Sequence, residues 1–72
     1  MLEQVEIRNH IRRLRFEHGE MTQDQLAKMT GVTRHTIMAL EAGKYLPSLL
    51  LAFRIAQAFE VGLEDVFELN SI

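Results

Sequence analysis

The chain has 72 residues, which is enough for one small domain built around one hydrophobic core. It contains no cysteine, so disulfide bonds, thiolate metal sites and thiol catalysis are excluded. Hydrophobic residues make up 47% of the chain and charged residues 25%, with a formal net charge of −2. This balance is typical of a soluble globular protein and argues against disorder.

The charges are unevenly distributed along the chain. Four acids and no bases follow residue 59, so residues 1–59 carry eight bases against six acids, a net of +2. This asymmetry permits an anion-binding face, although ordinary solvated surface charge explains it equally well. No apolar run approaches the roughly 20 residues of a membrane span, and no secretory signal is visible. We therefore expect a cytoplasmic protein without membrane contacts.

Glycine and proline divide the chain into short segments with helical periodicity. The first predicted helix covers residues 6–18, with Ile7, Ile11 and Leu14 on one side and Gly19 after its end. Arg12 and Arg13 on this helix are interpreted as part of its solvated surface. No metal role is expected for any histidine, because none has a suitably spaced second ligand. The three histidines are His10, His18 and His35.

Two short capped helices are predicted next. Thr22 and Gln25 form a capping box at the start of the second helix, which ends at Gly31. Thr33 is the N-cap of the third helix, which ends at Gly43. The residues of these helices that are expected to face the core are Leu26, Ala27, Met29, Ile37 and Leu40.

The last third of the chain contains two more predicted helices. Ser48 caps the fourth, and residues 63–67 form the short fifth. The apolar stripe of the fourth helix is expected to comprise Leu49, Ala52, Ile55, Ala56 and Phe59. No convincing strand-like alternation is seen, so the predicted fold is all-α with five helices in one domain, residues 1–72. For the tail, residues 68–72, the sequence is compatible with either a frayed end or a short extended segment.

The joint between the second and third helices has the pattern of a DNA-binding helix-turn-helix over about residues 22–43. Gly31 tolerates the positive φ of a tight turn, and Val32 fills the joint. Five segments follow one another in order: MTQDQLA (21–27), GVTRHTI (31–37), LEAGKY (40–45), PSL (47–49) and LEDVF (63–67). Together they resemble the lambda-repressor/Cro-type helix-turn-helix family, also called the Xre family, and in particular its small stand-alone prokaryotic members.

The resemblance implies a sequence-specific, double-stranded-DNA-binding transcriptional regulator that is not an enzyme and needs no cofactor. The residues that it places at base edges are Arg34, His35, Met38 and Ala39. Those that it places at phosphates are Gln23, Thr33, Thr36, Lys44 and Tyr45. It also implies an internal ion pair between Arg15 and Glu41. The family often has Gln, Asn and Lys where this chain has His35, Met38 and Ala42, so the target sequence does not carry over.

Arg34 is the best candidate for reading a guanine, since a guanidinium group fits O6 and N7, and a phosphate contact is the alternative. Residues 49–53 offer more apolar surface than one helix face can bury. The surplus is either packed in the core or part of a subunit interface. We expect a homodimer that is joined through the fifth helix and the C-terminal tail, residues 62–72, and that reads an inverted repeat with half-sites about 34 Å apart. The expected interface residues are Leu50, Phe53, Val66, Phe67, Leu69 and Ile72. The predicted function is a repressor; the alternative is an antitoxin-like module whose apolar C-terminal end binds a protein partner.

Overall fold

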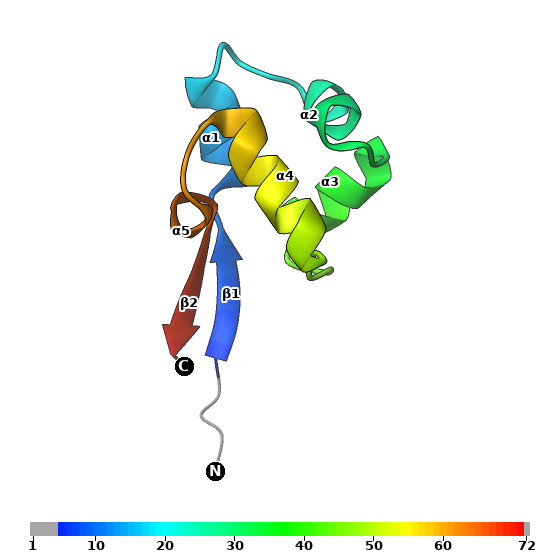
Figure 1. Ribbon diagram of the computed structural model, residues 1–72. Coiled ribbons are helices and arrows are strands. Elements are labelled where there is room, and N and C mark those ends of the chain that lie inside the picture. Colours follow the sequence, from blue (N-terminus) through cyan, green and yellow to red (C-terminus); the bar gives the residue numbers. More distant parts are fainter. Residues whose placement is uncertain (1–4, 72) are drawn as a thin grey trace.

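Five helices lie between two short strands in the computed structural model, which describes residues 5–71 (Figure 1). The elements are β1 (Val5–Asn9), α1 (Ile11–Glu17), α2 (Gln23–Thr30), α3 (Arg34–Glu41), α4 (Leu49–Phe59), α5 (Leu63–Val66) and β2 (Phe67–Ser71). The five predicted helices are therefore confirmed. None of the helices within residues 5–71 is long and apolar enough to cross a membrane.

Side-chain caps set where three of the helices begin. The Thr22 hydroxyl accepts the backbone N–H of Gln25 at 3.0 Å, and the Gln25 side chain accepts the N–H of Thr22 at 2.8 Å. Ser48 caps α4 in the same manner by accepting the N–H of Leu51 at 3.1 Å. The starts of α2, α3 and α4 agree with the predicted caps because these hydrogen bonds are local in sequence.

The prediction of an all-α fold is wrong at the two ends of the described chain. β1 and β2 pair antiparallel, with Ile7 opposite Leu69, and project from the helical part as a two-stranded ribbon (Figure 1). The tail is thus extended, which was one of the two open possibilities, and α5 ends at Val66 rather than at residue 67. The backbone N–H of His10 donates to the Val66 carbonyl at 2.8 Å and holds the two strands together where they leave the helices.

The first helix begins at Ile11 rather than at residue 6. Asn9, the last residue of β1, explains the late start, because its side chain bonds both the first residue of α1 and the neighbouring helix α3. Its Oδ1 accepts the Ile11 N–H at 3.3 Å and its Nδ2 donates to the Leu40 carbonyl at 2.9 Å. Ile7 therefore lies in a strand, where it is 37% exposed, and does not belong to the buried stripe of α1.

The core receives side chains from all five helices. Its buried members include Ile11, Leu14, Leu26, Ala27, Ile37, Leu40, Leu51, Ile55, Ala56, Phe59 and Val66. Besides Ile7, two expected core residues are wrong: Met29 is 56% exposed and Leu49 is 68% exposed. Leu51, one turn before Ile55, occupies the buried stripe of α4, and Leu49 lies at the edge of that stripe in the first turn.

Candidate DNA interface

The joint between α2 and α3 is a tight turn closed by backbone hydrogen bonds. Gly31 ends α2 in the left-handed conformation, with φ 76° and ψ 28°. The backbone N–H groups of Gly31 and Val32 both donate to the Ala27 carbonyl. Val32 then packs against the core, as expected for a residue that fills the joint. The turn therefore fixes the angle at which α3 leaves α2.

Helix α3 has one buried side and one exposed side. Ile37 is 0% exposed and Leu40 2% exposed, whereas Met38 is 43% exposed. Arg34 and His35 are also exposed, and Ala39 is half-buried. The fold thus brings three of the four predicted base-reading side chains to the outer side of α3, with the small Ala39 near its boundary.

The start of α3 is closed by two threonines. The Thr33 hydroxyl accepts the backbone N–H of Thr36 at 3.2 Å, and the two hydroxyl oxygens lie 3.1 Å apart. One hydroxyl hydrogen is used between the pair, so the second remains available to an outside acceptor. The backbone N–H groups of the first turn of α3 also lack partners within the helix. The start of α3 therefore offers several hydrogen-bond donors to an anion.

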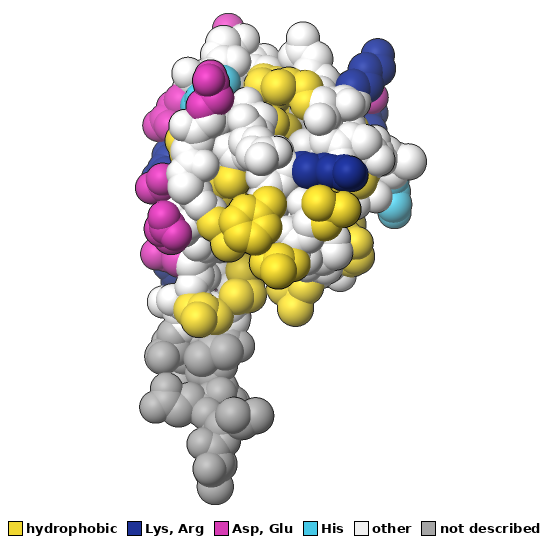
Figure 2. Space-filling model, in the orientation of Figure 1, with side chains coloured by type: hydrophobic (Ala, Val, Ile, Leu, Met, Phe, Trp, Pro, Cys, Tyr) yellow, Lys and Arg dark blue, Asp and Glu magenta, His cyan; other side chains and the backbone are white. Residues whose placement is uncertain are grey.

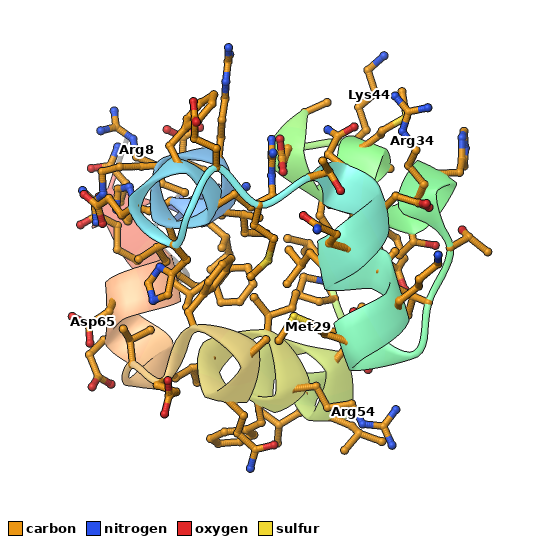
Figure 3. All side chains as sticks on the ribbon, turned by 90° about the horizontal axis from the view of Figure 1, so that it is seen from above. Arg8, Met29, Arg34, Lys44, Arg54 and Asp65 are labelled. Carbon is orange, nitrogen blue, oxygen red and sulfur yellow. The ribbon has the colours of Figure 1, made fainter. Side chains whose placement is uncertain are left out.

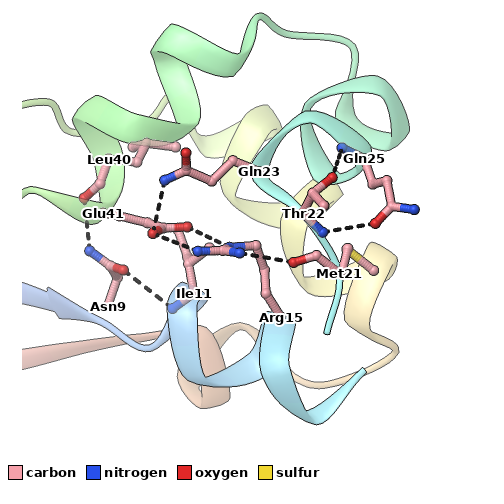
Figure 4. Close-up of polar contacts among 9 residues, drawn as sticks. All are labelled: Asn9, Ile11, Arg15, Met21, Thr22, Gln23, Gln25, Leu40 and Glu41. Atoms are coloured by element: carbon pink, nitrogen blue, oxygen red, sulfur yellow. Dashed lines mark hydrogen bonds and ion pairs between the residues drawn. The ribbon is translucent and has the colours of Figure 1, made fainter. Parts of the chain in front are cut away.

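A polar network connects α1, the start of α2 and the end of α3 (Figure 4). Arg15 donates through Nε to Glu41 Oε2 at 2.8 Å and through Nη2 to Glu41 Oε1 at 3.0 Å. Gln23 Nε2 donates to the same Oε1 at 3.3 Å. The Arg15 and Glu41 side chains are only 10% and 12% exposed. Gln23 is thus held at the first position of α2 by the same carboxylate that fixes α3.

A hollow opens between α1, the start of α2 and α3. Its lining includes Arg12 and Phe16 from α1, Thr22 and Gln23 from the start of α2, and Arg34 from α3. Arg34 and Lys44 lie on the same side of the molecule, and Arg54 lies on the opposite side (Figure 3). Within residues 5–71, neither Arg34 nor Lys44 forms an ion pair. Tyr45, beside Lys44, is 45% exposed. The outer side of α3 and the hollow therefore share one face that carries uncompensated positive charge.

The residues expected at a dimer interface are only partly available. Leu50 is 60%, Phe53 48% and Leu69 71% exposed, and Phe67 is half-buried against the core. Val66 is wrong as an interface residue, because it is 0% exposed and packs in the core as the last residue of α5. Ile72 lies outside the described residues.

The exposed apolar surface also includes residues that were not predicted. Figure 2 shows hydrophobic side chains gathered on the face that α4 presents. Leu46 and Leu49 are each 68% exposed, and Ile7 is paired with Leu69 on the ribbon. The alternation of Val5, Glu6, Ile7 and Arg8 was the available signal for Ile7, since it places apolar residues on one side of a strand. We call the set Ile7, Leu46, Leu49, Leu50, Phe53 and Leu69 the apolar patch.

Metal ligands were not predicted from the sequence, and the side chains of residues 5–71 include no group of three His, Asp or Glu that could hold an ion. His35 is exposed on α3. His18 instead lies between two helix ends, with its ring nitrogens 2.7 Å from the Leu14 carbonyl oxygen and 2.9 Å from that of Phe59.

Comparison with known proteins identifies the family. The family described as Helix-turn-helix matches residues 11–66. An uncharacterised HTH-type transcriptional regulator of Archaeoglobus fulgidus is 52% identical over 61 residues, which is 85% of this chain and 86% of the relative. The uncharacterised HTH-type transcriptional regulator YgzD of Bacillus subtilis is 46% identical over 64 residues, 89% of this chain and 96% of the relative.

A solved structure has the same arrangement of helices. The restriction-modification controller protein C.AhdI from Aeromonas hydrophila superposes with a TM-score of 0.70 at 27% identity, over 76% of this chain and 78% of that protein. The family match over residues 11–66 includes the whole of α1 to α5, and so both helices of the joint. The chain therefore belongs to the Xre-type, lambda-repressor-like family of helix-turn-helix transcriptional regulators, which bind DNA and are not enzymes.

Proposed function

We propose that the protein is a sequence-specific repressor that binds double-stranded DNA as a homodimer, with α3 of each copy in the major groove. The observation that carries the proposal is the two-sided structure of α3. Its inner side is fixed by Ile37, Leu40 and the Arg15–Glu41 pair, and its outer side is exposed. A helix that is rigidly held and exposed on one side is the geometry with which helix-turn-helix proteins read base edges.

The contacts divide into two classes, of which only one carries sequence information. The phosphate contacts come from Gln23, Thr33, Thr36, Lys44 and Tyr45, which surround the ends of α2 and α3. Base contacts come from Arg34, His35, Met38 and the adjoining Ala39. Arg34 donates to a guanine, whereas Met38 offers only apolar contact, for example with a thymine methyl group. The repressor acts in the cytoplasm, where its operator lies, and excludes polymerase by occupying a promoter.

A second copy of the chain covers the apolar patch in this proposal. The patch spans α4, the preceding loop and the ribbon. An isolated two-stranded ribbon is marginally stable in water, and burial of Ile7 and Leu69 between two copies stabilises it. A two-fold dimer also presents two α3 helices to the half-sites of an inverted repeat.

Selection of bound sequences from random double-stranded DNA tests the proposal. We expect enrichment of an inverted repeat with half-sites about one helical turn, roughly 34 Å, apart. Placing that repeat before a reporter gene should lower expression when the protein is present. Absence of any enriched sequence contradicts the proposal and favours the alternative, in which the apolar patch binds a protein partner.

The dimer is tested separately by light scattering of Phe53→Glu. Phe53 is 48% exposed in the patch, so the charged side chain should leave a folded monomer that loses affinity for the full repeat. Met29→Glu is the matched control, because Met29 is 56% exposed on α2 and lies outside the patch. Equal masses for the wild type and Phe53→Glu at the same protein concentration contradict the proposed interface.

A further inference from the structure

Two adjacent arginines on α1 have different surroundings, although both are exposed. Arg13 pairs with Glu17 one turn later, with 3.7 Å between its Nε and Glu17 Oε2. Arg12 takes part in none of the ion pairs formed among residues 5–71. Both arginines were interpreted as solvated surface. Of the two, only Arg13 has its charge compensated by a neighbouring acid.

The Arg12 side chain rests against an aromatic ring. Its guanidinium carbon lies 5.7 Å from the centre of the Phe16 ring, and that of Arg15 lies 5.8 Å from the same centre. Arg15 is fixed by Glu41 and by the Met21 carbonyl, to which it donates at 2.8 Å. Phe16 is itself 53% exposed. The ring thus holds Arg12 at the surface by a cation–π contact, which restricts where its charge can lie.

Arg12 also faces the same hollow as the residues of the proposed DNA interface. Arg12, Gln23 and Arg34 all line this hollow. The two acids in its lining, Glu41 and Asp24, each have a cation beside them, Arg15 at 2.8 Å and Lys28 at 3.9 Å. The charge left uncompensated in the hollow is that of Arg12 and Arg34, so its walls are positive on both sides.

We infer that Arg12, held by Phe16, is a further DNA-binding residue that contacts a backbone phosphate next to the one contacted by Gln23. The inference rests on the proposed function and extends the interface from α2 and α3 onto α1. A guanidinium is well suited to this contact because it donates to phosphate oxygens in a planar fork. A phosphate contact adds affinity for every sequence and does not change the preference for any base.

Titration of DNA binding against salt separates Arg12 from its neighbour. Each neutralised phosphate contributes about −0.9 to the slope of log K against log salt concentration. Because the proposed dimer carries two copies of Arg12, Arg12→Ala should reduce the magnitude of that slope by about 1.8 and lower the affinity by roughly tenfold for each copy. The loss should be equal on a selected target duplex and on the same duplex with its sequence scrambled. Arg13→Ala, the control, should retain the slope and affinity of the wild type.

The aromatic support is tested with two substitutions of Phe16. Phe16→Leu keeps an apolar side chain and removes the ring, so affinity should fall by about two- to fivefold for each copy in the dimer, the value of one exposed cation–π contact. Phe16→Tyr keeps the ring and should bind as the wild type does. Thermal unfolding shows whether each Phe16 variant keeps its fold. We expect both variants to do so, because the side chain at this position is 53% exposed.

The outcomes distinguish this inference from the proposed function. Normal slopes for Arg12→Ala, in a wild type that binds its target, overturn the role of Arg12 and leave the proposed function intact. A change of preference at one base pair overturns it too, since Arg12 would then contact a base. A wild type that binds neither duplex overturns the proposed function and, with it, the inference.

Discussion

The guanidinium of Arg15 on α1 meets both carboxylate oxygens of Glu41 at the end of α3, at 2.8 Å and 3.0 Å. The remaining terminal nitrogen of Arg15 donates to the Met21 carbonyl in the loop before α2, at 2.8 Å. Because the pair is nearly buried and fully hydrogen-bonded, it holds α3 against α1 at a fixed position. The exposed side of α3 is therefore oriented by residues that do not themselves lie on it.

Removing one member of this pair should destabilise the protein strongly. Arg15→Ala leaves the Glu41 carboxylate at 12% exposure without its cation, and loss of one partner of a buried pair costs about 3–5 kcal/mol. The free energy of unfolding in urea measures this loss. Arg15→Met combined with Glu41→Leu should recover most of it, because no charge is then left buried.

Arg13→Ala is the control for the buried pair. The Arg13 and Glu17 side chains are each 58% exposed, and exposed pairs contribute less than about 1 kcal/mol. We expect its unfolding free energy to stay within about 0.5 kcal/mol of the wild type, as is usual for surface substitutions. Equal losses for Arg15→Ala and Arg13→Ala would show that the Arg15–Glu41 pair does not fix α3.

Two helix caps should have the same effect on stability and different effects on DNA binding. Thr33 caps α3 and Ser48 caps α4, each by accepting a backbone N–H, at 3.2 Å and 3.1 Å. Replacing either by Ala should cost about 1 kcal/mol in the free energy of unfolding. Only Thr33→Ala should also weaken DNA binding, since Thr33 is a proposed phosphate contact. Thr33→Ser should have the stability and the DNA affinity of the wild type. If Thr33→Ala and Ser48→Ala changed DNA affinity equally, Thr33 would not be a phosphate contact.

The sequence predicts the central helices well because local chemistry sets their ends. Thr22 and Thr33 make hydrogen bonds to residues three positions away, and these bonds are visible in the sequence as caps. The ribbon was missed because its pairing is not local: Ile7 contacts Leu69 across almost the whole chain. Ile7 also fits the helical spacing of Ile11 and Leu14. The sequence around Ile7 is therefore compatible with both a helix and a strand.

The candidate site was predicted in the same uneven way. The residues on α3 followed from the resemblance to a family with this joint, and the fold places them on one side. Arg12 and Arg13 are identical, adjacent residues, so the sequence gives little reason to assign them different roles. The residues four positions later, Phe16 and Glu17, indicate different neighbours for the two side chains but not which one faces DNA. That Arg12 faces Gln23 and Arg34 depends on how α1 packs beside α2, which no local pattern contains.

Gly31 should be replaceable only at the expense of stability. Its φ of 76° is unfavourable for residues with a Cβ, although a methyl group would meet only Arg54 Nη1, at 3.7 Å. Gly31→Ala should therefore cost about 1–2 kcal/mol through backbone conformation alone. Gly31→Asn should cost less, because Asn tolerates the left-handed conformation. Thermal unfolding ranks the two, and an Asn variant less stable than the Ala variant would show that crowding rather than φ decides.

Arg34 should determine the preference at one base pair of the target. It is exposed in the first turn of α3 and has no acidic partner among residues 5–71, so its guanidinium is free to donate to guanine O6 and N7. Arg34→Ala should weaken binding to the selected target by about 1–3 kcal/mol for each half-site and relax selection at one position of each half-site only. Repeating the selection with the variant measures both effects. A uniform loss of affinity over all sequences, with the preference unchanged, would make Arg34 a phosphate contact and leave base reading to His35 and Met38.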